Sequence, residues 1–190
     1  MKIIGLTGGI GSGKSTIAKV FTYFNSVVFI ADNEAKFIQN NNQYAISETK
    51  KLFGNDIYIN NQLDRKTVSK LVFSNPNLLE KLNTIIHPLV KSAFDVFVEN
   101  NKNKDFIIIE SAILVQSGFY KFTDFNVLVT APLNIRLERV AKRDNLSIDA
   151  IKARISNQLD DSENQKFCNY SIINDNKHSV IEQVKEIINN

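Results

Sequence analysis

The sequence predicts an α/β fold of three layers, in which a five-stranded parallel sheet lies between two layers of helices. Short apolar runs alternate along the chain with longer stretches whose apolar residues recur every three or four positions. A glycine-rich segment, residues 8–15, follows the first apolar run and precedes an amphipathic stretch. The 190 residues contain no linker that would separate two independent domains, so a single domain spanning residues 1–190 is expected.

Five short apolar runs are the predicted strands of this sheet. Each is rich in Ile, Val or Phe and bounded by polar residues, and its continuous hydrophobicity indicates burial on both faces. In chain order the runs cover residues 2–7, 27–31, 106–110, 126–130 and 171–174, the last with the weakest pattern. Because predicted strands and helices alternate, the strands are expected to run parallel.

The helices are predicted from apolar spacing and from residues typical of helix ends. Asn75 followed by Pro76 indicates a helix N-terminus, with Asn as the cap and Pro at the first helical position. Apolar residues then recur at helical spacing as far as His87. Pro88 has no backbone N–H, so it is expected to kink or end this helix, and residues 89–97 to form its continuation or successor.

The glycine-rich loop reads Gly8-Gly9-Ile10-Gly11-Ser12-Gly13-Lys14-Ser15 and matches G-x-x-x-x-G-K-S/T over its full length. A predicted strand precedes it and an amphipathic helix follows it, which is the context required of a phosphate-binding P-loop. Glycines leave the backbone N–H groups accessible, and the helix N-terminus adds further N–H groups and a positive dipole end. The alternative, a glycine-rich turn beside an unrelated lysine, does not explain why strand, loop and helix occur together.

The P-loop predicts a three-layer P-loop NTPase fold that binds ATP and Mg²⁺. Lys14 is expected to bridge the β- and γ-phosphates, and the Ser15 hydroxyl to ligate Mg²⁺. The residues predicted to bind the nucleotide are Gly11, Ser12, Gly13, Lys14, Ser15 and Thr16. A signalling GTPase would also carry D-x-x-G and N-K-x-D patterns, and neither occurs in the sequence. A small-molecule kinase with a mobile lid is therefore the favoured class.

Composition restricts the expected partners and location. The net charge of +3 and pI near 8.9, without a block of consecutive Lys or Arg, suit an anionic small molecule at least as well as a nucleic acid. Cys168 is the only cysteine, so no intrachain disulfide is possible, and it is interpreted as a small packed side chain. No apolar run approaches the roughly 20 residues of a membrane span, and the N-terminus lacks secretory features. We expect a cytoplasmic monomer or weak homo-oligomer with no nucleic-acid or membrane partner.

A series of short segments, in order along nearly the whole chain, is shared with one family. They read LTGGIGSGKST at residues 6–16, AD at 31–32, LFG at 52–54, LDR at 63–65, FSNP at 73–76, LNTIIHP at 82–88 and RVAKRD at 139–144. In these segments the chain resembles the dephospho-coenzyme A kinases. It departs from the family pattern at Ile30, where an Asp is frequent, at Lys36, near a usual Arg, and at Gln116, in place of a usual Glu.

The resemblance implies that ATP phosphorylates the 3′-hydroxyl of dephospho-coenzyme A, a small-molecule substrate. It places the carboxylate of Asp32, after the second predicted strand, at the acceptor hydroxyl. The alternative for Asp32 is to cap a helix that begins near Asn33. The same resemblance puts Arg65, His87 and Lys91 on the acceptor side, the alternative for His87 being a histidine packed in the core.

Further residues are assigned to the phosphate side. Glu110 ends a predicted strand like a Walker B acid, so it is interpreted either as binding Mg²⁺ through water or as a bare strand-end acid. Arg136, Arg139 and Arg143 share one predicted helix face, a pattern typical of a solvated basic surface. Their likeness to the family's lid helix favours contacts from Arg139 and Arg143 to the ATP phosphates, with Arg136 less important. The predicted catalytic residues are Lys14, Asp32, Arg139 and Arg143.

Within the single domain, residues from about 33 to 100 are expected to form a helical acceptor-binding region and about 133–150 the lid. Two other functions remain open at this point. One is a P-loop kinase for a nucleoside monophosphate or another small metabolite, and the other is a non-catalytic nucleotide-binding module. ADP release that depends on an acceptor separates transfer from binding, and a panel of acceptors separates the two kinases.

Overall fold

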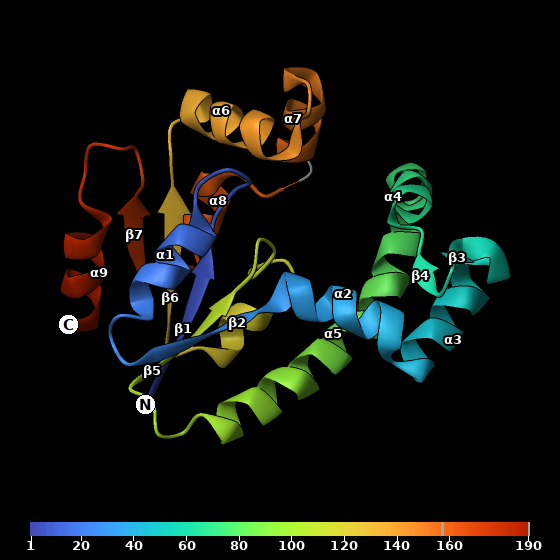
Figure 1. The fold of residues 1–190 in the computed structure, drawn as a ribbon, viewed down its shortest axis with the longest axis horizontal. Coiled ribbons are helices and arrows are strands. Elements are labelled where there is room, and N and C mark those ends of the chain that lie inside the picture. The colour runs from blue at the N-terminus through green and yellow to red at the C-terminus, as the bar shows by residue number, and fades with distance from the viewer. Residues whose placement is uncertain (157, 190) are drawn as a thin grey trace. The chain divides into compact units, whose positions relative to one another are not determined.

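The chain forms two compact units in the computed structural model, which describes residues 1–156 and 158–189 (Figure 1). The first unit comprises Met1–Ile30 and Val98–Asn190, and the second comprises Ala31–Phe97. The second unit covers nearly the same residues as the helical region expected from the sequence.

The first unit contains a five-stranded parallel sheet with strand order β2-β5-β1-β6-β7. The strands are β1 (Lys2–Thr7), β2 (Ser26–Ile30), β5 (Phe106–Glu110), β6 (Phe125–Thr130) and β7 (Tyr170–Ile173). Every end lies within one residue of its predicted position, which confirms the predicted strands. Because β1 occupies the centre, the loop that follows it starts in the middle of the carboxyl edge, where open α/β sheets bind their ligands.

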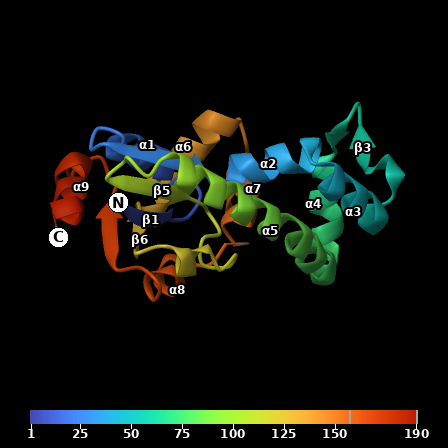
Figure 2. The ribbon, with the colours of Figure 1, turned by 90° about the horizontal axis from the view of Figure 1, so that it is seen from below.

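Helices cover both faces of this sheet. The helices α1 (Lys14–Phe21) and α9 (Val180–Asn189) pack on one face, where Ile17, Phe21 and Val184 join the core side chains of the strands. The helix α8 (Asp161–Gln165) lies on the opposite side of the sheet from α1 (Figure 2). Leu114, which precedes the short helix η2 (Phe119–Phe122), packs against Gly5 of β1 on that side. The three-layer P-loop fold predicted from the sequence is therefore confirmed.

The predicted lid region contains one helix and the start of another. The helix α6 (Leu133–Asp144) follows β6 and ends at Asn145, which has a left-handed backbone with φ 51°. The helix α7 (Ile148–Ile155) then begins behind Ser147, whose hydroxyl accepts a hydrogen bond from the Ala150 N–H. Residues 133–150 thus cover α6 and the first turn of α7.

The second unit is mostly helical. Its elements are α2 (Ala31–Asn41), α3 (Gln43–Phe53), η1 (Asn55–Ile57), β3 (Tyr58–Ile59), β4 (Gln62–Leu63), α4 (Arg65–Ser74) and most of α5 (Pro76–Asn100). Sequence patterning missed the hairpin β3–β4, because each strand has only two residues. Asn60 and Asn61 join the strands with φ of 51° and 62°, the left-handed pair that a tight hairpin turn requires and that Asn tolerates.

The helix α5 runs through Pro88 without ending, so the sequence interpretation of a continued helix is the correct one. Its predicted start is also confirmed, since Pro76 is the first residue and the Asn75 side chain accepts the Asn77 N–H at 3.2 Å. Buried side chains on both sides of Pro88, such as Ile86 and Val90, stabilise the helix by packing although one backbone hydrogen bond is missing. No helix in the described part of the chain, α5 included, has the length and hydropathy needed to cross a membrane.

Cys168 lies between α8 and β7 and is half-buried. Burial raises the pKa of its thiol to about 11, because the apolar surroundings disfavour the thiolate. These observations agree with the interpretation of Cys168 as a packed side chain.

Candidate phosphate-binding site

The P-loop joins the end of β1 at Thr7 to the start of α1 at Lys14. Three of its residues have positive φ, namely Gly8 at 148°, Gly11 at 79° and Gly13 at 95°. Glycine adopts these dihedrals without the steric cost that other residues carry. The resulting turn leads directly into α1, in which the Thr16 and Ile17 N–H groups donate to the Gly13 carbonyl at 3.0 and 3.1 Å. The N-terminus of a helix favours an anion because the helix dipole is positive there.

The glycines also let neighbouring segments pack against the outer side of the loop. A Cβ on Gly8 would overlap the Val129 backbone oxygen, and one on Gly11 would lie 2.6 Å from the Arg136 backbone oxygen. A Cβ on Gly13 would overlap the Asn174 side-chain amide. Any side chain at these positions would move the loop or its neighbours, so the shape of the loop depends on glycine.

Polar side chains of the loop are arranged as a polyphosphate requires. The Lys14 ammonium donates to the Gly8 carbonyl at 2.8 Å, which holds its charge over the loop. The Ser12 side chain is 1% exposed, and its hydroxyl has no hydrogen-bond partner within the described residues. A buried hydroxyl without a partner is costly, and an anionic oxygen bound at this loop would satisfy it. The loop therefore fits the phosphates of a nucleotide.

Ser15 and Glu110 form the predicted metal-binding pair. The Ser15 hydroxyl donates to Glu110 Oε1 at 3.1 Å. Glu110 is buried at the last position of β5, where it is in register with Leu6 of β1 and Ile30 of β2. A hydroxyl beside a carboxylate supplies the hard oxygen ligands that Mg²⁺ prefers, so these two residues would hold the ion. The structure thus brings together both residues assigned to the metal.

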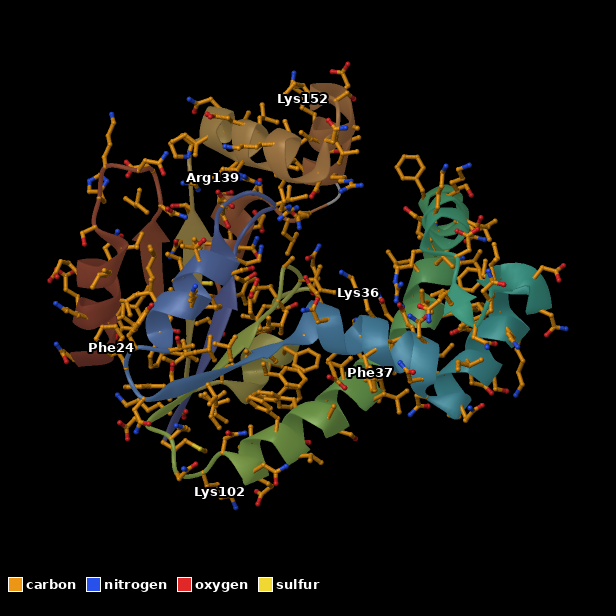
Figure 3. The ribbon with its side chains drawn as sticks, in the orientation of Figure 1. Phe24, Lys36, Phe37, Lys102, Arg139 and Lys152 are labelled. Carbon is orange, nitrogen blue, oxygen red and sulfur yellow. The ribbon has the colours of Figure 1, made fainter. Side chains whose placement is uncertain are left out.

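Two arginines of α6 contact the P-loop backbone. The Arg139 side chain reaches from α6 toward the loop (Figure 3), where Nη1 donates to the Ser12 carbonyl at 3.3 Å. Arg136 is 9% exposed and donates from Nε to the Ile10 carbonyl at 2.9 Å. The sequence-based ranking had placed Arg136 below the other two arginines, whereas the structure gives it the shorter contact with the loop.

Arg143 lies elsewhere on α6. Its guanidinium forms a two-pronged ion pair with the adjacent Asp144, at 2.7 and 2.9 Å, and its side chain is 63% exposed. The hydrogen bonds to Asp144 raise the pKa of Arg143 and lower that of the carboxylate. The structure therefore brings Lys14, Ser15, Glu110 and Arg139 around the loop and places Arg143 at Asp144.

Residues that sequence reasoning had not selected complete the surroundings of the loop. The Asn174 side-chain amide donates to the Ser12 carbonyl at 2.8 Å, and Asn176 accepts from Arg139 at 2.8 Å. Gln158 Oε1 accepts the Ile10 N–H at 2.7 Å. Asn174 directly follows β7, so its position at the carboxyl edge of the sheet was a usable signal. Gln158 offered none, because it precedes a short helix in a polar stretch.

Asp32 belongs to the second unit, together with the other residues predicted for the acceptor. It is exposed and is the second residue of α2, which begins at Ala31. The expected helix start near Asn33 is therefore wrong, and Asp32 does not occupy the N-cap position. A carboxylate in the first helical turn interacts favourably with the positive end of the helix dipole, so Asp32 keeps a local role there.

The remaining acceptor-side residues have distinct environments. Arg65 is exposed, and its Nη2 donates to the Lys36 carbonyl in α2 at 3.1 Å. His87 and Lys91 lie one turn apart on α5 and are both half-buried, with Lys91 paired to Asp95 at 2.6 Å. Burial lowers the pKa of His87 below its ordinary value, so its imidazole is neutral at pH 7.

Replacing Lys14 by Ala should weaken phosphate binding without unfolding the protein. The ammonium donates to a loop carbonyl, so its loss should lower MgADP affinity by roughly 10- to 100-fold, the cost typical of one hydrogen bond to a charged group. Calorimetric titration with MgADP measures the loss, and circular dichroism checks the fold. Lys19→Ala is the matched control, because Lys19 is exposed on the same helix. Near-normal MgADP binding by Lys14→Ala would contradict the P-loop assignment.

His87 should make the protein less stable in mild acid. Its pKa is lowered in the folded state, so the unfolded chain binds more protons below the ordinary histidine pKa of about 6.5. The contribution is therefore fully present above that pH and is lost as the pH falls below it. Denaturant unfolding at pH 8, 7, 6 and 5 should show a smaller decline for His87→Leu than for the wild type. An equally steep decline in His87→Leu and the wild type would contradict a lowered pKa of His87.

Comparisons with known proteins agree with this geometry. The family model for dephospho-CoA kinases matches residues 2–179. A dephospho-CoA kinase of Bacteroides fragilis is 36% identical over 185 residues, which cover 97% of this chain and 90% of that protein. A solved structure from Thermus thermophilus has a TM-score of 0.83 at 30% identity, covering 98% of this chain and 95% of that one. A dephospho-CoA kinase structure from Campylobacter jejuni has a TM-score of 0.68 at 24% identity with the same coverage. This chain belongs to the dephospho-CoA kinase family.

Proposed function

We propose that this chain transfers the γ-phosphoryl group of ATP to the 3′-hydroxyl of dephospho-coenzyme A, giving coenzyme A and ADP. This is the last step of coenzyme A biosynthesis. The observation that carries the proposal is the complete P-loop, with Lys14 over the loop and the Ser15–Glu110 pair beside it, in a member of this family. We also propose a cytoplasmic location, which agrees with a single, packed cysteine.

On the donor side, the residues of the first unit hold the phosphates and neutralise charge. Phosphoryl transfer depends mainly on alignment and on electrostatic stabilisation, and Lys14 and the N-terminus of α1 supply both. Ser15 and Glu110 would hold Mg²⁺, which when bound neutralises charge on the β- and γ-phosphate oxygens. Arg139 lies against the loop, where its guanidinium adds a second fixed cation. These residues favour the transition state because charge develops on the departing ADP while the charge of the transferred group is spread over its three outer oxygens.

On the acceptor side, Asp32 is the proposed proton acceptor for the ribose hydroxyl. It follows the last residue of β2, Ile30, by two positions, and Ile30 is in register with Glu110 at the carboxyl edge of the sheet. Its carboxylate is exposed in the first turn of α2, so it is accessible to a substrate hydroxyl. The acceptor is proposed to be bound by Arg65, His87 and Lys91. The phosphate groups of dephospho-coenzyme A would pair with the two cationic side chains, Arg65 and Lys91.

A panel of acceptors tests the proposed substrate. Dephospho-coenzyme A should give a higher kcat/KM than AMP, CMP or adenosine, because the family-like segments outside the P-loop belong to dephospho-coenzyme A kinases. ADP release measured with a coupled assay at saturating MgATP gives the ranking. A higher kcat/KM for a nucleoside monophosphate would favour the rival kinase. Binding of MgADP without release of ADP for any acceptor would favour a nucleotide-binding module.

Asp32→Asn separates a chemical role from a structural one. The substitution keeps the size of the side chain but removes the base, so the transfer rate should fall by roughly 10² to 10⁴-fold. Binding of MgATP should be unchanged, because Asp32 is not part of the P-loop. A single-turnover measurement with saturating MgATP and dephospho-coenzyme A gives the rate, and Glu34→Gln, in the same helical turn, is the control. A rate within about threefold of the wild type, far short of the range for a general base, would leave Asp32 with no chemical role.

A further inference from the structure

Arg136 is a buried cation that the proposed mechanism does not use. Its side chain is 10% exposed and lies between the P-loop and α8. Nε donates to the Ile10 carbonyl at 2.9 Å, and Nη1 lies 3.5 Å from Asp161 Oδ2. The rest of the guanidinium packs against Gly9, where a Cβ would overlap it. The Arg136 side chain therefore contacts two consecutive residues of the loop and one residue of α8.

Burying a guanidinium has a cost that one long ion pair does not offset. Removing a cation from water is unfavourable unless hydrogen bonds satisfy its donors, and an apolar side chain of similar volume is frequently as stable in such a position. Asp161 is 33% exposed, so its attraction for Arg136 is partly screened. Fold stability alone gives little reason for an arginine here, whereas the contact with Ile10 gives a specific one.

The peptide groups on either side of Ile10 are held from two directions. Gln158 Oε1 accepts the Ile10 N–H at 2.7 Å, and Arg136 Nε donates to the Ile10 carbonyl at 2.9 Å. Further along the loop, the Ser12 carbonyl accepts from the Asn174 amide at 2.8 Å. The carbonyl groups of Ile10 and Ser12 thus both face side chains outside the loop.

The direction of these carbonyls fixes the direction of the next N–H groups. A peptide unit is planar and trans, so the carbonyl of one residue and the N–H of the next point in opposite directions. Because the Ile10 carbonyl faces Arg136, the Gly11 N–H faces away from α6. Because the Ser12 carbonyl faces Asn174, the Gly13 N–H faces away from that side chain as well. Both N–H groups therefore point away from the side chains that surround the loop, and backbone N–H groups of such a loop are the donors that bind an anion.

We propose that Arg136 is a positioning residue that holds the P-loop in its phosphate-binding conformation before the nucleotide arrives. It acts through the Ile10 carbonyl, with Gln158 holding the opposite side of that residue and Asp161 orienting the guanidinium. The proposal rests on nucleotide binding at the P-loop, as in the proposed function. It distinguishes Arg136 from Arg139, which is the arginine proposed to face the phosphates.

Arg136→Met and Arg136→Lys test this role together. Met fills the buried volume without a donor, and Lys keeps the charge but cannot donate to Ile10 and pair with Asp161 in the same fork geometry. If each substitution lowers the fraction of molecules with the loop in its phosphate-binding conformation tenfold, MgADP affinity falls by about tenfold in both variants. Titration calorimetry with MgADP measures this. The KM for ATP should rise, and the KM for dephospho-coenzyme A should not.

Lys142→Met is the matched control, since Lys142 is an exposed cation on the same helix. It should bind MgADP as the wild type does. Wild-type MgADP affinity in a folded Arg136→Met, or rescue of affinity by Arg136→Lys, would overturn the proposal. If Arg136→Met does not fold, Arg136→Lys decides the matter. Failure of both variants to fold would show that Arg136 is needed for the fold itself and would also overturn the positioning role.

Gln158→Leu adds a test that a general structural role does not predict. If Gln158 and Arg136 both hold Ile10, the double variant Gln158→Leu/Arg136→Met should lose less MgADP binding free energy than the sum of the losses in the two single variants. Full additivity would contradict a shared action on Ile10. These experiments measure MgADP binding, whereas failure of the proposed function would be seen in the wild type, as MgADP binding without transfer to dephospho-coenzyme A.

Discussion

A polyphosphate can be bound by backbone N–H groups only where the chain turns without side chains in the way, and this constraint organises the whole first unit. The turn starts at Thr7, at the end of the central strand, and ends at Lys14, at the start of a helix. Its glycines serve two purposes, because they allow left-handed dihedrals and also let β6, α6 and Asn174 come close from outside. Substrate binding and domain packing therefore depend on the same missing Cβ atoms.

The strands and the P-loop could be predicted because the pattern that identifies each of them lies within one short segment of the sequence. A buried strand is continuous in hydrophobicity, so all five strands were located to within one residue. The P-loop has a fixed spacing, and its side chains act on atoms a few residues away, as Lys14 does on Gly8. The hairpin around Asn60 and the exact start of α2 were missed, because two-residue strands and helix ends carry weak patterns.

The surroundings of the loop could not be predicted, because they arise from contacts across more than 100 residues. Helical spacing placed Arg136 and Arg143 on one face of a helix, and seven residues do complete nearly two turns. Those turns also carry Arg143 about 10 Å along the helix axis, away from the position where Arg136 meets Ile10. Arg136 is therefore buried and Arg143 exposed, although both lie on the same face of the helix. Tertiary packing, not spacing, decides which cation meets the loop.

The burial that raises the pKa of Cys168 favours site-directed labelling at other positions of this chain. With a pKa of about 11, about one thiol in ten thousand is ionised at pH 7, far fewer than for an ordinary exposed cysteine. A maleimide dye should therefore react first with cysteines introduced at exposed positions. Lys36 in the second unit and Lys152 in the first are two such positions (Figure 3). Energy transfer between dyes at these two sites would test whether the distance between the two labelled positions changes during turnover, with the native cysteine left in place.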